Sequence, residues 1–247
     1  MSCVWQSKSD ANLIVAAKGS PEAILDLCHL SHRESSGIRQ ELDQMANLGL
    51  RVLGVAQATT RQMPAIQHDF EFEFVGLVGF ADPVRKRVPD AIRVCRSAGI
   101  HLVMITGDYP QTAKQIGKTV GLQERRVVTG DELRKMSDHD LQTSLPKIGI
   151  FARVIPEQKL RIIRAFQARG EIVAMTGDGV NDAPALKAAN IGIAMGKRGT
   201  DVAREAADLV LLDDAFESIV SGIQTGRQIF DNLRKAMAYV IAVHVPI

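Results

Sequence analysis

Acidic, hydroxyl-bearing and basic side chains gather in three short strings of this chain, each directly after an apolar run. The string TGDGVNDAPAL (residues 176–186) sets Asp178 and Asp182 four residues apart on a glycine-containing turn. Two carboxylates so close repel each other unless a cation or a proton lies nearby. Because Mg²⁺ prefers oxygen ligands, the string predicts a magnesium site. Asp182 also precedes Ala183 and Pro184, where it could instead cap the next helix.

The other two strings suit a phosphate group. Thr106-Gly107-Asp108 precedes a helix expected at Pro110, and the N–H groups of a helix start carry roughly half a positive charge. The string RVIPEQK (153–159) puts Lys159 on the first turns of another helix, where its charge could neutralise a transferring phosphoryl group. A plain helix cap and a solvated lysine are the alternative interpretations. Together the three strings suit phosphoryl transfer, which depends mainly on positioning and charge neutralisation.

The elements that must position these strings follow an alternating pattern. Short apolar runs alternate with segments of helical spacing, which predicts parallel βαβ units in a doubly wound α/β sheet. The runs are apolar throughout, as in strands buried on both faces. They lie at residues 101–105, 148–154, 171–175, 191–195 and 208–212. Helices are expected to start near prolines, which suit the first helical turn, at Pro89, Pro110, Pro156 and Pro184.

The two ends of the chain have a different texture. Residues 1–80 have a polar middle and predict a separate, incomplete domain, while residues 81–226 hold the three strings. After Phe216, apolar residues recur three, four or seven apart and predict one long amphipathic helix. We assign residues 227–247 to a stalk. Its last part, residues 237–247, is apolar but shorter than the about 20 residues that span a bilayer. It is interpreted as the first turns of a membrane helix, or alternatively as a buried C-terminal helix.

Composition excludes several classes of protein. The 247 residues are 46% hydrophobic, enough for a sizeable core, and 30 basic against 28 acidic residues give a net charge of only +2. No broad basic field favours nucleic acid. Three cysteines lie far apart, without the spacing of a zinc or redox site, and no signal peptide opens the chain. A reducing, cytoplasmic environment is therefore expected.

Taken together, the motifs resemble the haloacid dehalogenase-like superfamily and, within it, the P-type cation-transporting ATPases. TGDGVNDAPAL is similar to that family's hinge and magnesium motif, and residues 105–108 are similar to its phosphate-binding TGD. KGSPE (18–22) is similar to the nucleotide-domain motif KGAPE, and DPVR (82–85) to the domain hinge DPPR. The string from residue 195 to residue 208 also resembles the corresponding part of these ATPases. The presence of KGSPE argues against the heavy-metal-transporting branch of the family. The C-terminal tail of the chain resembles that of calcium-pump-like members.

The resemblance implies ATP as substrate, Mg²⁺ as cofactor and a haloacid dehalogenase-like fold with a partial α+β nucleotide-binding domain. Asp178 would hold the metal. The catalytic residues would be Thr106, Gly107, Asp108, Lys159 and Asp182. The residues that bind nucleotide or support the site would be Lys18, Gly19, Glu22, Arg51, Arg85, Arg153 and Asn181. Partners would be the transmembrane and actuator domains of a pump at the cytoplasmic face of a membrane, and the transported cation would bind in that remainder.

One part of the family's machinery does not occur here. The family's phosphorylated aspartate lies in a DKTGT motif, and no DKTGT is found in the sequence. Asp213-Asp214 follows an apolar run, but Ala215-Phe216 stands where Thr and Gly would be needed. Because covalent catalysis needs that carboxylate, the chain is expected to be inactive alone. A catalytically inactive nucleotide- or Mg²⁺-binding regulatory module and a soluble phosphatase are the alternatives, although the DxDxT motif of the phosphatases is absent as well.

Overall fold

The computed structural model describes residues 1–6, 12–122 and 126–244. The chain divides into two compact units. Unit 1 comprises Met1–Pro83 and Asp108–Ile116, and unit 2 comprises Val84–Gly107 and Gly117–Ile247. The helix α4 (Pro110–Thr119) therefore begins in unit 1 and ends in unit 2. The domain limits predicted from the sequence, 1–80, 81–226 and 227–247, remain predictions.

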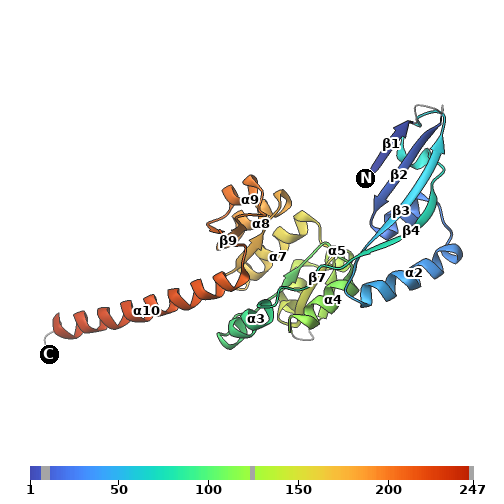
Figure 1. The fold of residues 1–247 in the computed structure, drawn as a ribbon. Coiled ribbons are helices and arrows are strands. Elements are labelled where there is room, and N and C mark those ends of the chain that lie inside the picture. Colours follow the sequence, from blue (N-terminus) through green and yellow to red (C-terminus); the bar gives the residue numbers. More distant parts are fainter. Residues whose placement is uncertain (7–11, 123–125, 245–247) are drawn as a thin grey trace. The chain divides into compact units, whose positions relative to one another are not determined.

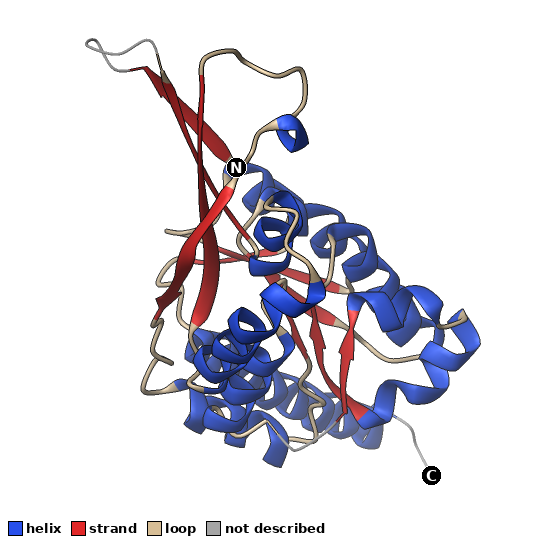
Figure 2. Cartoon of the chain, turned by 90° about the vertical axis from the view of Figure 1, so that its right-hand side faces the viewer, coloured by secondary structure: helices blue, strands red, loops and turns tan. Residues whose placement is uncertain are grey.

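Unit 1 is built on a four-stranded antiparallel sheet in the order β1-β2-β3-β4 (Figure 1), whose twist is clear in Figure 2. Its strands are β1 (Ser2–Gln6), β2 (Leu13–Gly19), β3 (Arg51–Thr60) and β4 (Glu73–Phe80). Side chains alternate between the two faces of a strand, and along β3 buried and more exposed residues alternate accordingly. The buried face, with Val15, Ala17, Ala56 and Ala58, packs against Ile24 and forms one hydrophobic core.

Two helices of unit 1, α1 (Pro21–Leu27) and α2 (His32–Asn47), begin at side-chain caps, and a third, the short 3₁₀ helix η1 (Gln67–Asp69), has none. The hydroxyl of Ser20 accepts the N–H of Ala23 at the start of α1. Ser31 and Glu34 form a reciprocal capping box at the start of α2. The KGSPE string thus contains the end of a strand, a helix cap and the first turn of a helix.

Unit 2 contains parallel strands, which confirms the predicted α/β class. They form two three-stranded sheets, in the orders β5-β7-β6 and β10-β9-β8. The strands are β5 (Met104–Ile105), β6 (Arg126–Thr129), β7 (Ile148–Ala152), β8 (Ala174–Gly177), β9 (Ile191–Met195) and β10 (Leu209–Leu211). All five residues of β7 are buried, as expected for a strand covered on both faces.

Helices connect the strands of unit 2. They are α3 (Val88–Ser97), α5 (Gly130–Lys135), α6 (Asp138–Ser144), η2 (Leu145–Lys147), α7 (Pro156–Ala168), η3 (Val180–Asp182), α8 (Ala183–Ala188), α9 (Asp201–Ala206) and α10 (Phe216–His244). The helix starts expected at prolines are confirmed, since Pro110 and Pro156 open α4 and α7 and prolines also lie in the first turns of α3 and α8. A core around Phe151 and Ile162 joins β7 to α7, and a second core around Leu186 and Ala194 joins α8 to β9.

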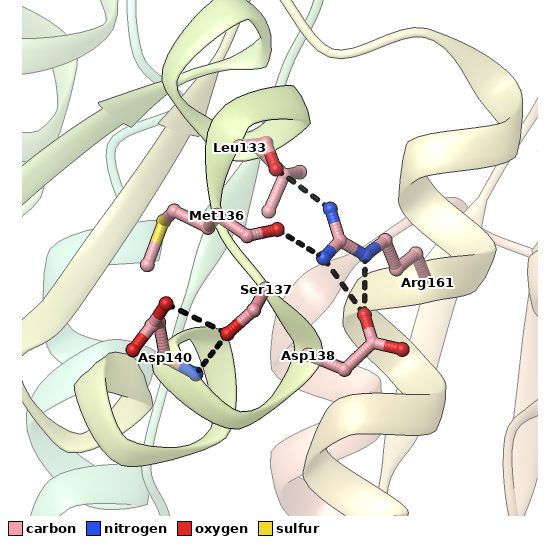
Figure 3. A network of polar contacts seen from close by, with 6 residues as sticks. All are labelled: Leu133, Met136, Ser137, Asp138, Asp140 and Arg161. Carbon is pink, nitrogen blue, oxygen red and sulfur yellow. Dashed lines mark hydrogen bonds and ion pairs between the residues drawn. The ribbon is translucent and has the colours of Figure 1, made fainter.

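Arg161 joins three helices of unit 2 (Figure 3). From α7, its guanidinium donates to the carbonyl oxygens of Leu133 and Met136, each at 2.6 Å, at the end of α5. It also donates to the carboxylate of Asp138 in the first turn of α6 at 2.8 Å. Carbonyl groups at a helix end commonly lack partners within the helix. Arg161 supplies a donor to the Met136 carbonyl and a second donor to the Leu133 carbonyl, which also accepts the N–H of Met136. Arg161 therefore fixes α5 and α6 against α7.

Replacing Arg161 by lysine is expected to destabilise unit 2 by about 1–3 kcal/mol. An ammonium group cannot reproduce the planar fork of donors, so at least one carbonyl at the end of α5 loses its partner. Urea denaturation followed by far-UV circular dichroism measures the change. Arg164 lies one turn further along α7 and is exposed, so Arg164→Lys is the matched control. Equal midpoints for both variants would contradict this role of Arg161.

The helix α10 is continuous over 29 residues, as the sequence predicts (Figure 1). Near its start Val220 packs with Ala91 and Cys95 of α3. Further along, apolar side chains such as Phe230 and Leu233 are exposed. Across the described residues, none of the helices is both long and apolar enough for a bilayer span. Residues 245–247 of the apolar tail lie outside the described part.

Candidate functional site

The loop after β8 is held by Asp182. One carboxylate oxygen of Asp182 accepts the backbone N–H groups of Asp178 and Gly179, at 3.4 and 3.3 Å. Gly177 allows the loop to fold this closely, because a Cβ atom there would lie 2.6 Å from the Cβ of Asp182. Asp182 is buried, whereas Asp178 is exposed. The two carboxylates, which the sequence predicts to lie at one magnesium site, therefore have different surroundings.

Lys159 and Asp182 form a partly buried ion pair. The ammonium of Lys159, in the first turn of α7, donates to the second carboxylate oxygen of Asp182 at 2.6 Å. Their side chains are only 16% and 10% exposed. Separating two buried charges costs free energy, because each would lose its partner without regaining water. The pair is therefore held in position. Lys159 is therefore not the solvated surface lysine of the alternative interpretation.

Thr106 is joined to the turn that begins α7. It follows β5, and its backbone N–H donates to the carbonyl of Phe151 at 2.9 Å. Its own carbonyl accepts the N–H of Val154 at 3.1 Å. Arg153, between these two contacts, has a φ of 55° in the left-handed region. The space where a Cβ of Gly107 would stand is open to beyond 4 Å.

Hydrogen bonds therefore link Thr106 and the other two predicted strings within unit 2, whereas Asp108, the last residue of TGD, belongs to unit 1. The TGD string is bonded to the start of the RVIPEQK string, whose Lys159 is bonded to Asp182 in the TGDGVNDAPAL string. The carboxyl ends of parallel strands are where ligands collect in open α/β sheets; β5 and β7 end at the first two strings in one sheet, and β8 ends at the third string in the other sheet. The roles predicted for Thr106, Gly107, Lys159 and Asp182 remain predictions.

Other predicted site residues lie in unit 1. The residues Lys18 and Val55 are register partners on β2 and β3, and Arg51 lies four residues before Val55, so Lys18 and Arg51 share the sheet face opposite the buried core. Arg51 pairs with Asp108 at 3.5 Å. Glu22 lies in the first turn of α1. Gly19 is the last residue of β2.

Two predicted residues have surroundings that the sequence does not indicate. Arg85 donates to the backbone carbonyl of Asp214 in unit 2. Asn181 is exposed within η3. The sequence gives Asp214 only as a substitute nucleophile, yet both of its carboxylate oxygens accept backbone N–H groups. The signal that could have found it is its place after the apolar strand β10, where a buried acidic residue needs donors.

The donor set suits Mg²⁺ rather than a softer metal. In the described part of the chain, no three His, Cys, Asp or Glu side chains form a group able to hold a metal ion. Mg²⁺ is usually held by one or two carboxylates together with phosphate oxygens and water, so it does not need such a group. Asp182 is engaged by Lys159, but the exposed carboxylate of Asp178 has no hydrogen bond or ion pair to another described side chain. Its exposure is compatible with the predicted role of Asp178 as the metal ligand, and that role remains a prediction.

Comparison with known proteins identifies two family models. The model of haloacid dehalogenase-like hydrolases matches residues 16–190, and a second model with the same description matches residues 160–223. The chain is 40% identical to the sodium/potassium-transporting ATPase subunit alpha of Tetronarce californica, with 97% of this chain and 28% of that protein covered. It is also 40% identical to the potassium-transporting ATPase alpha chain 2 of Oryctolagus cuniculus, over 97% of this chain and 26% of that protein.

The chain thus spans less than a third of the length of these relatives. The first family model covers well over half of the 247 residues, including the three strings that carry the site. Together with the parallel α/β fold of unit 2, this match identifies the chain as a member of the haloacid dehalogenase-like hydrolase family.

Proposed function

We propose that this chain is part of the cytoplasmic head of a cation-transporting P-type ATPase, where it binds ATP and takes part in Mg²⁺-dependent phosphoryl transfer. The observation that carries the proposal is the partly buried ion pair of Lys159 with Asp182, whose carboxylate also accepts the N–H of Asp178. This fixed cation lies in the same unit as the hydroxyl of Thr106 and the exposed carboxylate of Asp178, and each of the three residues follows the end of a parallel strand. The similarity to sodium/potassium- and potassium-transporting ATPase alpha subunits supports this proposal.

Each residue would contribute through position and charge. Lys159 would neutralise the transferring phosphoryl group, and Asp182 holds its ammonium in place until that group arrives. Thr106 and the N–H groups near Gly107 would orient the phosphoryl oxygens. Asp178 would hold Mg²⁺, which when bound draws negative charge away from the phosphoryl group. On unit 1, Lys18 and Arg51 offer two cations on one sheet face for a nucleotide.

The phosphorylated aspartate would come from outside this chain. Both candidates, Asp213 and Asp214, are occupied, since the Asp213 carboxylate accepts the N–H of Ala215 and the hydroxyl of Ser218 and the Asp214 carboxylate accepts two backbone N–H groups. The transmembrane and actuator segments of a pump would be the partners, and the cation sites would lie in the membrane. The stretch at residues 237–247 would then be the start of a membrane helix. Assignment to a calcium-pump-like branch remains a prediction.

Binding and labelling experiments with ATP test the proposal. The chain should bind ATP, and Lys18→Met should weaken binding about tenfold or more through loss of a phosphate contact, which corresponds to about 1.4 kcal/mol. Titration calorimetry measures the affinity. Lys114→Met removes an exposed lysine elsewhere in unit 1 and is the matched control. Absence of ATP binding would contradict the proposed nucleotide role.

Radiolabelled ATP with Mg²⁺ addresses the chemistry. Because no DKTGT motif is present, the chain alone should acquire no hydroxylamine-sensitive acyl phosphate. Adding the purified upstream segment of the same gene, if it encodes DKTGT, should restore labelling on that segment. A labelled acyl phosphate on this chain by itself would overturn the claim that the nucleophile lies elsewhere.

A further inference from the structure

The loop between β9 and α9, residues 196–200, is held from one side by a buried aspartate. One carboxylate oxygen of Asp214 accepts the N–H of Lys197 at 2.9 Å, and the other accepts the N–H of Arg198 at 3.0 Å. Asp214 is only 5% exposed. Hydrogen bonds to an ionised acceptor are stronger than those between neutral groups, so Asp214 fixes the middle of this loop firmly.

The same loop is held at its ends by an arginine. The guanidinium of Arg204, from α9, donates to the carbonyl of Gly196 at 3.1 Å and also to the carbonyl of Gly199. At Gly199 the chain turns back so tightly that a Cβ atom would lie 1.9 Å from the carbonyl oxygen of Met195. Two anchors of opposite charge therefore hold a loop of five residues, which leaves it little freedom to change shape.

Asp214 is itself constrained by its neighbours. It has a φ of 55°, in the left-handed region that non-glycine residues seldom adopt. Its N–H donates to the carbonyl of Leu211 at 3.1 Å, and its own carbonyl accepts the guanidinium of Arg85. Burial would raise the pKa of Asp214, but the amides of Lys197 and Arg198 hold the pKa below its ordinary value. The carboxylate is therefore ionised near neutral pH.

The last residue of the loop reaches the candidate metal site. The backbone N–H of Thr200 donates to the backbone carbonyl of Asp178 at 2.9 Å. Thr200 thus holds the carbonyl of Asp178, and the carboxylate of Asp182 holds its N–H. The position of the Asp178 carboxylate therefore depends on where the loop places Thr200.

We propose that Asp214 is a positioning residue for Asp178. It fixes the loop of residues 196–200 so that Thr200 holds the backbone of Asp178 and keeps its carboxylate in place for a divalent ion. The proposal rests on the proposed function, in which Asp178 holds Mg²⁺. Groups that support a metal ligand without touching the metal typically change metal affinity by about 10–100-fold when removed.

Binding of Mn²⁺ to the whole chain, followed by electron paramagnetic resonance, tests the proposal without any need for activity. Asp214→Asn keeps the shape of the side chain but replaces one acceptor oxygen by an NH₂ group, so one of the two loop bonds is lost. Its Mn²⁺ dissociation constant should rise about tenfold or more. Asp213→Asn is the matched control, because the bonds of Asp213 go to Ala215 and Ser218 and not to the loop. It should bind Mn²⁺ as the unaltered chain does.

A second pair of variants addresses the bond to Asp178 itself and does not depend on the folding of Asp214→Asn. Thr200 has a φ of −70°, which proline can adopt, so Thr200→Pro removes the N–H without changing this angle, and its ring Cδ then faces the Asp178 carbonyl and breaks the contact. It also removes the hydroxyl that caps α9. Thr200→Ala removes only that hydroxyl and keeps the N–H. Weaker Mn²⁺ binding in Thr200→Pro than in Thr200→Ala supports the proposal.

The outcomes separate this proposal from the proposed function. If Asp178→Asn weakens Mn²⁺ binding while Asp214→Asn and Thr200→Pro bind as tightly as their controls, the positioning role is overturned and the metal role of Asp178 stands. If Asp178→Asn binds Mn²⁺ as tightly as the unaltered chain, the metal role fails, and the positioning role fails with it. Hydrogen exchange of the β7 peptide identifies any variant whose unit 2 has lost its fold.

Discussion

Replacing Lys159 by methionine is expected to lower the free energy of unfolding of unit 2 by about 3–5 kcal/mol. Methionine fills much of the space of the lysine stem but leaves Asp182 buried without a cationic partner. The remaining donors to Asp182 are the two backbone N–H groups of its loop, at 3.3 and 3.4 Å, and these do not replace a charge at 2.6 Å. The cost is therefore that of an uncompensated charge more than that of a lost contact.

Trp5, the single tryptophan, belongs to unit 1, so its fluorescence does not report on the Lys159 site. Hydrogen exchange of peptides covering β7 and β8 is the appropriate measurement, and Lys159→Met should reduce their protection. Lys187→Met, at an exposed position of α8, is the matched control and should change stability by no more than about 0.5 kcal/mol.

A double variant separates lost charge pairing from other effects. Asn at position 182 keeps an oxygen that can accept the loop N–H groups but carries no charge. The combined variant Lys159→Met with Asp182→Asn should therefore recover part of the stability lost in Lys159→Met alone. If the stability lost in the double variant equals the sum of the losses in the two single variants, the two side chains are energetically independent. The broken ion pair is then not the cause of the instability of Lys159→Met.

Replacing Phe151 by alanine is expected to cost about 3–5 kcal/mol, because it opens a cavity in the core of unit 2. Phe151 is fully buried in β7 and packs within the core cluster that includes Leu133, Leu141 and Ile162. Its backbone carbonyl also accepts the N–H of Thr106. A disturbance of this core should therefore extend to the strand end that carries the predicted phosphate-binding turn.

Urea denaturation by far-UV circular dichroism, with hydrogen exchange at β7, measures the effect of Phe151→Ala. Phe151→Leu retains most of the volume and should cost less than about 1.5 kcal/mol. Phe230→Ala removes a phenylalanine that is 66% exposed on α10 and should have little effect. Similar losses for Phe151→Ala and Phe230→Ala would show that the core around β7 does not limit the stability of unit 2.

Sequence periodicity located most strands of unit 2 but not their limits, and it predicted neither β6 nor the individual strands of unit 1. Residues 191–195 were predicted as a strand and form β9, whereas the run at residues 171–175 yields a strand at Ala174–Gly177. The reason is that Val173 is bonded to Asn190, whose side-chain oxygen accepts the Val173 N–H at 2.9 Å. The ladder between β8 and β9 begins only after that contact. Such a bond depends on which residues the fold brings together, so spacing along the chain does not reveal it.

The sequence by itself determined which residues stand at strand ends and helix starts, because apolar runs, glycines and prolines are local signals that act through the backbone. It therefore located Thr106, Lys159, Asp178 and Asp182 close to strand ends and helix starts. Only the tertiary structure decided their partners. Lys159 pairs with Asp182, 23 residues away, and Arg85 reaches Asp214, 129 residues away. The pairing with Lys159 distinguishes a buried, engaged Asp182 from an exposed Asp178, since burial and partners are set by packing between segments distant in sequence.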